Sequence, residues 1–341
     1  MTSAPAAVAV VIPARNGLPD VLDAVESALT QLPPPAEVIV VDDASTDGTA
    51  DAVRARFGDR VRVVSGRFDG AAAARNAGWR AARSPWVALL DADDLWFEGK
   101  LAHAMALLEA HPLAAWCFSD GRFRTVDGVW HDSWFALYAE LPEPYFGQPV
   151  AELFTVNFVL TSSVIVRRDA LEAIGGFNET MSHAEDLDLW IRLARRWPAV
   201  GTTRPLVRYQ HLQSGLTRKV EARLGGNASL FGRLATDSTL TPALRRRARN
   251  RASLSALKLG WTALREGRGA EARASLAAAW LFPERALPVA LAWILSLLPR
   301  PLFLMLKRQS WAHHTVAAPM LAVQRVVLRG SSPESAAEGA R

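Results

Sequence analysis

The stretch PWVALLDADDLW, residues 85–96, places a buried strand directly before a group of acids. Residues 86–90 are apolar, and three aspartates follow within four positions: Asp91, Asp93 and Asp94. Carboxylates gathered at a strand end repel one another unless a cation lies among them, and their hard oxygens suit Mg²⁺ or Mn²⁺. Because Mg²⁺-type sites use one or two carboxylates and complete their shell with water and substrate phosphates, the stretch predicts a metal that carries a phosphorylated substrate.

The first 120 residues alternate between short apolar runs and helix-like segments. The apolar runs cover residues 8–13, 37–43, 61–65, 86–91 and 114–120. The helix-like segments are Asp20–Gln31, Asp47–Phe57, Ala71–Ala82 and Glu98–Ala110. This order predicts an α/β fold with a mostly parallel sheet covered on both faces.

Polar motifs follow three of these runs, and ligands of such sheets bind beyond the carboxyl ends of the strands. The motifs are PARN after the first run, DDAS after the second and DADD after the fourth. A simpler explanation covers some of these residues, since Asp47 or Ser45 is expected to cap the next helix and Asp94 the segment that starts at Leu95. That explanation does not account for all three clusters at one edge.

Residues 120–180 alternate less regularly. A strand is predicted over 161–168, a helix over 182–196 and a strand over 205–211, which ends at His211. Beyond about residue 218 no strand is expected, and Thr241-Pro242 begins a helix. The sequence thus predicts a C-terminal all-helical appendage.

One cysteine, Cys117, excludes an internal disulfide and fits a reducing compartment. The N-terminus lacks a basic region before its first apolar run and passes directly into a strand pattern, so no secretory signal is predicted. We therefore expect a cytoplasmic protein.

Charge is distributed unevenly along the chain. Residues 241–341 contain 16 Lys and Arg against 5 Glu, a net of +11, whereas the preceding 240 residues have a net of −6. A basic region indicates phosphates of nucleic acid or of a membrane surface. Interleaved tryptophans and the lack of a nucleic-acid motif favour the inner face of a membrane, although a helical hairpin packed on the rest of the chain is an equal alternative. The apolar run 286–298 is too short to span a bilayer.

Five motifs in order resemble the family 2 glycosyltransferases, which have the GT-A fold. They are VVIPARNG (10–17), VIVVDDASTDGT (38–49), AAARNAGWRAA (72–82), VALLDADD (87–94) and GGFNET with AEDLDLWIRL (175–193). The resemblance covers residues 6–216 and implies a nucleotide-sugar donor, Mg²⁺ or Mn²⁺, and inversion at the anomeric carbon. It implies a catalytic domain over 1–218, with a nucleotide-sugar half to about 120 and an acceptor half beyond. Residues 219–330 then form the basic helical region, and 331–341 a disordered tail.

The resemblance also assigns roles to single residues. Asp43 accepts from the base, Arg75 approaches the diphosphate or base, Asp91 faces the ribose or sugar, and Asp93 binds the metal. Pro13, Ala14 and Arg15 line the nucleotide. On the other side of the reaction, Asp186 is the general base, Glu185 raises its pKa, Trp190 lies on the acceptor side or in the core, and His211 is a second metal ligand or a structural residue.

Processive members of the family carry Q-x-x-R-W after the base, and this pattern is missing here, so a non-processive transferase is predicted. The acceptor is a saccharide or a lipid-linked sugar, and uridine is the first nucleotide to test, before guanosine or thymidine. A catalytically silent nucleotide-sugar binder and a nucleotidyltransferase are the alternatives. No nucleic-acid partner is expected.

Overall fold

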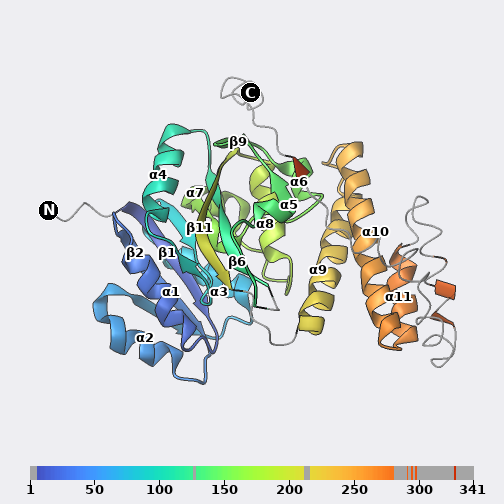
Figure 1. Ribbon diagram of the computed structural model, residues 1–341, viewed down its shortest axis with the longest axis horizontal. Coiled ribbons are helices and arrows are strands. Elements are labelled where there is room, and N and C mark those ends of the chain that lie inside the picture. Colours follow the sequence, from blue (N-terminus) through green and yellow to red (C-terminus); the bar gives the residue numbers. More distant parts are fainter. Residues whose placement is uncertain are drawn as a thin grey trace. The chain divides into compact units, whose positions relative to one another are not determined.

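The computed structural model describes residues 6–125, 128–210 and 216–279, with a few single positions between 290 and 327. The chain divides into two compact units, the first made of Met1–Gln213 with Arg325–Arg341 and the second of Ser214–Gln324. The first unit contains the sheet, and the second is built from helices (Figure 1).

Four parallel strands form the first half of the sheet, in the order β3-β2-β1-β4. They are β1 (Ala6–Ala14), β2 (Pro35–Asp43), β3 (Arg62–Gly66) and β4 (Trp86–Leu89). The connecting helices are α1 (Asp20–Leu29), α2 (Thr49–Phe57), the short 3-10 turn η1 (Gly58–Arg60) and α3 (Ala71–Ala81). The predicted βα repeats are therefore confirmed, and the carboxyl ends of the four strands share one edge of the sheet.

The core of this half is dense around β1 because that strand has a neighbour on each side and helices pack on the sheet. Residues Val8–Ile12 are all 0 % exposed, and a strand buried on both faces reads as a continuous apolar run. Helix α3 packs closely on β1 at Gly78, where an added Cβ would lie only 2.3 Å from Val11 Cγ1. This close packing fixes the place of Arg75, which lies one turn earlier on α3.

The second half of the sheet is mixed. Strand β10 (Ile165–Arg167) is antiparallel to both β4 and β6 (Trp116–Arg124), whereas β6 and β11 (Ala199–Gln210) are parallel to each other. Three short strands pair antiparallel with this part: β5 (Leu95–Trp96) and β9 (Tyr145–Gly147) with β11, and β7 (Trp130–His131) with β6. The remaining elements of the unit are α4 (Lys100–Ala110), α5 (Phe135–Tyr138), β8 (Ala139–Glu140), α6 (Val150–Leu153), α7 (Arg168–Ile174) and α8 (Glu185–Ala194).

Two predicted strands in this half have the wrong extent. The strand expected over 161–168 is β10 alone, because Thr161–Ser163 form the 3-10 turn η2, in which the Ser163 hydroxyl donates to the Leu160 carbonyl at 2.7 Å. The strand expected from residue 205 begins at Ala199, where β11 pairs with β9.

Between residues 216 and 279, the described stretch of the second unit forms the helices α9 (Leu216–Thr236), α10 (Pro242–Arg265) and α11 (Gly269–Ala279). The Thr241 hydroxyl caps α10 by accepting from the Leu244 N–H at 3.3 Å, and Pro242 occupies the first turn, as predicted. Helices α10 and α11 approach closely at Gly260, where an added Cβ would lie 2.7 Å from Leu276 Cγ.

One short strand contradicts the purely helical expectation for residues 219–330. Strand β12 (Val326–Val327) pairs in parallel with β8, and both strands belong to the first unit; two β-branched residues favour extended backbone. Most of the apolar run 286–298 and the whole tail 331–341 lie outside the described residues. In the part of the chain that is described, no helix is both long and apolar enough to cross a membrane.

Candidate active site

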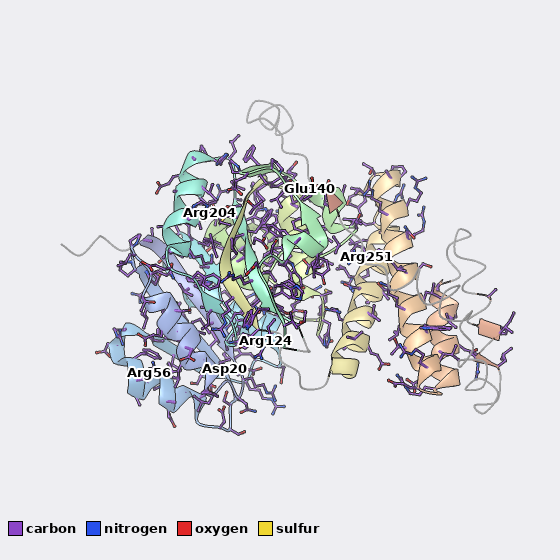
Figure 2. The ribbon with its side chains drawn as sticks, viewed as in Figure 1. Asp20, Arg56, Arg124, Glu140, Arg204 and Arg251 are labelled. Atoms are coloured by element: carbon purple, nitrogen blue, oxygen red, sulfur yellow. The ribbon has the colours of Figure 1, made fainter. Side chains whose placement is uncertain are left out.

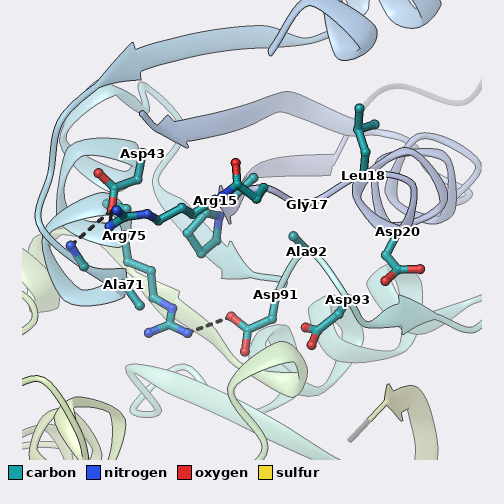
Figure 3. Close-up of a pocket in the computed structure, with 15 residues that line it drawn as sticks. Arg15, Gly17, Leu18, Asp20, Asp43, Ala71, Arg75, Asp91, Ala92 and Asp93 are labelled. Atoms are coloured by element: carbon teal, nitrogen blue, oxygen red, sulfur yellow. Dashed lines mark hydrogen bonds and ion pairs between the residues drawn. The ribbon is translucent and has the colours of Figure 1, made fainter. Parts of the chain in front are cut away.

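A pocket of about 330 Å³ lies where β1, β2 and β4 end (Figure 3). All seven residues expected to bind the donor line it: Pro13, Ala14, Arg15, Asp43, Arg75, Asp91 and Asp93. The other lining residues are Asn16, Gly17, Leu18, Asp20, Gly70, Ala71, Ala74 and Ala92. Three motifs that are far apart in the sequence thus meet around one cavity.

Asp43 is held at the pocket by backbone donors. Its Oδ1 accepts from the Phe68 N–H at 2.7 Å and its Oδ2 from the Gly70 N–H at 3.1 Å, and Arg15 Nη1 lies 3.7 Å from Oδ2. Gly70 has a φ of +132°, a conformation that L side chains rarely adopt, so glycine is required at this donor. Because each carboxylate oxygen has two lone pairs, Asp43 retains capacity to accept from a ligand.

The loop after β1 is fixed by side chains that follow β2. The Asn16 N–H donates to Ser45 Oγ at 2.9 Å, and the Leu18 N–H donates to Asp47 Oδ2 at 3.1 Å. Asp47 also accepts from the Thr49 N–H at 3.0 Å, so it serves the start of α2, whereas the expectation that Ser45 caps this helix is wrong because its hydroxyl holds Asn16. These bonds shape the wall of the pocket that carries Arg15 and Gly17.

Arg75 connects the pocket to the beginning of α8. Arg75 is 6 % exposed; its Nη2 donates to Asp91 Oδ1 at 2.7 Å, and its Nη1 donates to Glu185 Oε1 at 3.0 Å (Figure 3 shows the first of these). Burial opposes the charge on Arg75, but the two carboxylates outweigh it and raise its pKa above the ordinary value. Arg75 therefore remains a cation that bridges Asp91, which follows β4, and Glu185, at the start of α8.

Asp94, the third acid of the opening stretch, is buried and only 1 % exposed. Its Oδ2 accepts from the Ser162 hydroxyl at 2.5 Å and its Oδ1 from the Gln210 N–H at 3.0 Å. Burial, followed by the charges of the two neighbouring aspartates, raises the pKa of Asp94 well above its usual value. The expected cap at Leu95 is wrong, because both oxygens of Asp94 instead tie the acidic turn to η2 and to the end of β11.

Asp186 is the second residue of α8. Its Oδ2 accepts from Asn157 Nδ2 at 2.9 Å, and its Oδ1 accepts from the Leu187 N–H at 2.7 Å. Burial, followed by the negative charge of Glu185, raises the pKa of Asp186 to about 6. A carboxyl group that titrates so close to neutral pH is suited to proton transfer.

Helix α8 also shows which of its residues are structural. Asp188 pairs with Arg192 at 2.7 Å, one turn along the helix. Trp190 is 0 % exposed, and its ring stacks on that of Trp116 with centroids 5.8 Å apart and planes at 8°. The assignment of Trp190 to the acceptor side is therefore wrong, because the apolar face of α8 places it in the core.

His211, the second expected metal ligand, lies outside the described residues. Among the residues that are described, no three His, Cys, Asp or Glu side chains gather in an arrangement that holds a metal. Asp91 and Asp93 do lie on the same side of the pocket (Figure 3).

Several residues of the site were not predicted. Ser162 supports the acidic turn by accepting from the Asp91 N–H at 3.0 Å while its own hydroxyl binds Asp94, and Asn157 positions Asp186. Their residue types carry no signal, since Ser and Asn are common in loops and their partners lie 71 and 29 positions away. Ala71 and Ala74, at the start of α3, were also missed. Their small side chains leave room for a ligand, but alanine carries no functional group that would indicate a binding role.

Comparison with known proteins agrees with this geometry. The sequence model described as Glycosyl transferase family 2 matches residues 9–175. The succinoglycan biosynthesis protein ExoU of Rhizobium meliloti is 40 % identical over 107 residues, which are 30 % of this chain and 31 % of ExoU. The Escherichia coli UDP-Glc:alpha-D-GlcNAc-diphosphoundecaprenol beta-1,3-glucosyltransferase WfaP is 34 % identical over 103 residues, which are 30 % of this chain and 41 % of WfaP. The chain thus spans less than half the length of these two relatives.

Among solved structures, the mannosyltransferase PcManGT from Pyrobaculum calidifontis, in complex with GDP-Man and Mn²⁺, has a TM-score of 0.58. It is 24 % identical, and the superposition covers 94 % of this chain and 87 % of PcManGT. This likeness shows a shared fold, the α/β sheet of GT-A type that the motifs predict. Over residues 9–175, the chain belongs to glycosyl transferase family 2.

Proposed function

We propose that this protein is a metal-dependent, non-processive glycosyltransferase that moves one sugar from a nucleotide-sugar to an acceptor hydroxyl with inversion at the anomeric carbon. The observation that carries the proposal is the bridge made by Arg75. It binds Asp91, which lines the pocket, and Glu185, which directly precedes Asp186. A donor held in the pocket would therefore lie next to a carboxyl group suited to deprotonate an acceptor.

The nucleotide would occupy the end of the pocket near Asp43. A carboxylate accepts from a base that offers an N–H, and the imide N–H of uracil is such a donor. Arg15, whose side chain is 64 % exposed, would reach the diphosphate at the rim. UDP is the preferred nucleotide in this proposal; WfaP is named for UDP-Glc, and the guanosine and thymidine nucleotides are the alternatives.

The donor set at the acidic turn fits Mg²⁺ or Mn²⁺. Asp93 would hold the ion, with Asp91 beside it and His211 as a further ligand, and water and the donor diphosphate would complete the oxygen shell. PcManGT, with the same fold, was solved with Mn²⁺. The metal would offset the negative charge that develops on the leaving diphosphate.

On the acceptor side, Asp186 would remove the proton from the hydroxyl as its oxygen attacks the anomeric carbon. A single displacement of this kind leaves the carbon inverted and releases the nucleoside diphosphate. Asn157 and the Leu187 N–H hold the carboxylate of Asp186 in place, and its pKa of about 6 leaves it ionised at neutral pH.

The cellular setting that we propose is synthesis of a cell-surface polysaccharide at the inner face of the membrane, with a saccharide or lipid-linked acceptor. ExoU is named for succinoglycan biosynthesis, and WfaP for a diphosphoundecaprenol-linked acceptor. The basic helices of the second unit would contact anionic headgroups: Arg246 and Arg247 of α10 are exposed, whereas Arg251 lies over the Phe231 ring at 5.2 Å (Arg251 is labelled in Figure 2).

The decisive experiment is a screen of nucleotide-sugars for donor hydrolysis, with and without Mg²⁺ or Mn²⁺. Metal-dependent release of one nucleoside diphosphate supports the proposal. Binding of donor without any hydrolysis or transfer indicates a silent binder. A nucleotidyltransferase would instead release pyrophosphate in a separate assay that supplies a nucleoside triphosphate and a sugar 1-phosphate. Vesicle flotation tests the setting, because the full chain should float with anionic vesicles at low salt and less so at high salt.

A further inference from the structure

The acidic turn, residues 91–94, is held at both ends by one hydroxyl group. The Ser162 hydroxyl accepts from the Asp91 N–H at 3.0 Å and donates to Asp94 Oδ2 at 2.5 Å. Within the turn, the Asp94 N–H donates to the Asp91 carbonyl at 3.1 Å. Asp93, to which we assign the metal, lies between these two fixed residues and lines the pocket (Figure 3). The position of Asp93 therefore depends on that of Ser162.

Ser162 belongs to η2, and two buried donors hold the backbone of that turn. Lys100 Nζ donates to the Ser163 carbonyl at 3.0 Å, and Trp96 Nε1 donates to the Ser162 carbonyl at 2.8 Å. The Lys100 ammonium group also lies over the Trp96 ring, 4.6 Å from its centroid, so each donor supports the other. These contacts connect the first residue of α4 to the acidic turn by way of η2.

The surroundings of Lys100 are unfavourable for a cation. The residue is 0 % exposed, and burial lowers the pKa of its ammonium group to about 8. It is also the first residue of α4, where the helix dipole disfavours positive charge. Among the residues that the structure describes, no Asp or Glu forms an ion pair with it. A neutral side chain of the same length would be more favourable for stability alone, so the ammonium group has another use.

We propose that Lys100 is a positioning residue of the metal site, which acts through η2 and Ser162 to hold Asp93 where the donor metal binds. This inference rests on the proposed function and adds to it a residue that does not line the pocket. A charged donor holds a carbonyl more firmly than a neutral donor does, so η2 keeps its place when the metal draws on the acidic turn.

The test is titration of the full chain with Mn²⁺ in the presence of UDP, followed by the electron paramagnetic resonance signal of free Mn²⁺. Lys100→Met keeps the length of the side chain and removes the ammonium group, and we expect about tenfold weaker Mn²⁺ binding. Its melting temperature at pH 7 should stay the same or rise, because a buried charge is removed. Trp96→Phe keeps a ring and removes the second donor, so it should also weaken Mn²⁺ binding.

Two further variants separate positioning from a structural role. Ser253→Ala is the matched control, because Ser253 is also 0 % exposed and its hydroxyl donates to the Ala279 carbonyl in the second unit at 2.8 Å. It should lower the melting temperature and leave Mn²⁺ binding unchanged. Ser162→Ala should weaken Mn²⁺ binding at least as much as Lys100→Met. The double variant should bind no more weakly than Ser162→Ala alone, because both residues act along one path.

Three results would overturn the inference: Lys100→Met binds Mn²⁺ as the wild type does, it loses Mn²⁺ binding and melting temperature together, or its effect adds in full to that of Ser162→Ala. The second result would make Lys100 a structural residue. Donor hydrolysis on the same samples should regain the wild-type kcat in Lys100→Met at saturating Mn²⁺, because the ammonium group touches no reacting atom. A wild-type protein that binds no Mn²⁺ with UDP would instead reject the metal of the proposed function, and the inference with it.

Discussion

The two halves of the sheet hold their functional residues in different ways. In the parallel half, β1, β2 and β4 end at one edge, so residues that directly follow a strand meet without further help. In the mixed half, Asp186 depends on Asn157, whose side chain holds the carboxylate through a hydrogen bond across 29 positions of sequence. The residues that we assign to the donor are thus positioned by topology, and the base that we propose is positioned by individual hydrogen bonds. Variants that affect one half and spare the other test this difference.

The largest effect is expected at the base. Asp186→Asn removes the proton acceptor but keeps the size of the side chain, so turnover should fall by about 10²–10⁴-fold while donor affinity changes little. Kinetics of transfer, with donor binding measured by calorimetry, provide the check. Asp188→Asn on the same helix is the control, because its carboxylate pairs with Arg192 one turn along the helix. Lost donor binding with retained turnover would give Asp186 another role.

In the parallel half, we expect a variant to weaken donor binding rather than to slow turnover. Asp93→Asn should leave the fold intact and weaken donor binding in the presence of Mg²⁺ or Mn²⁺ by roughly 10–100-fold. Without metal, the variant and the wild type should bind the donor equally weakly. Asp51→Asn, at an acid that is 90 % exposed on α2, is the control. Equal affinity of the Asp93 variant and the wild type at all metal concentrations would remove the metal role.

A smaller effect, on stability, tests how the parallel half places Arg75. Gly78→Ala inserts a methyl group 2.3 Å from Val11 Cγ1, so we expect a loss of about 1–3 kcal/mol in the free energy of unfolding. Gly232→Ala in α9 meets nothing within 4 Å and should stabilise by about 0.5–1 kcal/mol, because alanine is the better helix former. Denaturant unfolding monitors both. An unchanged free energy of unfolding in the Gly78 variant would mean that the contact between α3 and β1 adapts. In that case the contact does not fix the position of Arg75.

The same difference explains how far sequence alone leads. The seven residues that we assign to the donor were expected to meet, and they line one pocket, because strand-end motifs and a parallel topology are both readable from local pattern. Asp186 was predicted only through the family motif, since acids at a helix N-terminus have an ordinary structural explanation. For Trp190 the sequence left both the acceptor side and the core open, because position on a helix does not say which side of that helix faces a ligand. Ser162 and Asn157 were missed, since each acts through a partner that only the tertiary fold brings close.

The smallest predicted change joins the two halves, because Glu185 lies between Arg75 and Asp186. The negative charge of Glu185, after burial, raises the pKa of Asp186 to about 6, whereas the charge of Arg75 lowers it. Glu185→Gln removes the negative charge of Glu185, and it also leaves Arg75 less neutralised, so both changes lower the pKa of Asp186.

Since Asp186 acts as a base only when ionised, activity in the wild type should fall as the pH drops through about 6. In the variant this acidic limb should move to lower pH, so the rate at pH 5 relative to the rate at pH 8 should rise. Turnover at saturating donor across pH 4.5–8 measures the limb. Glu172→Gln, at a half-exposed acid paired with Arg168, should leave it in place. A limb that moves to higher pH would show that Glu185 acts on the base through its bond to Arg75 rather than through its charge, and that the two halves of the sheet are coupled by geometry.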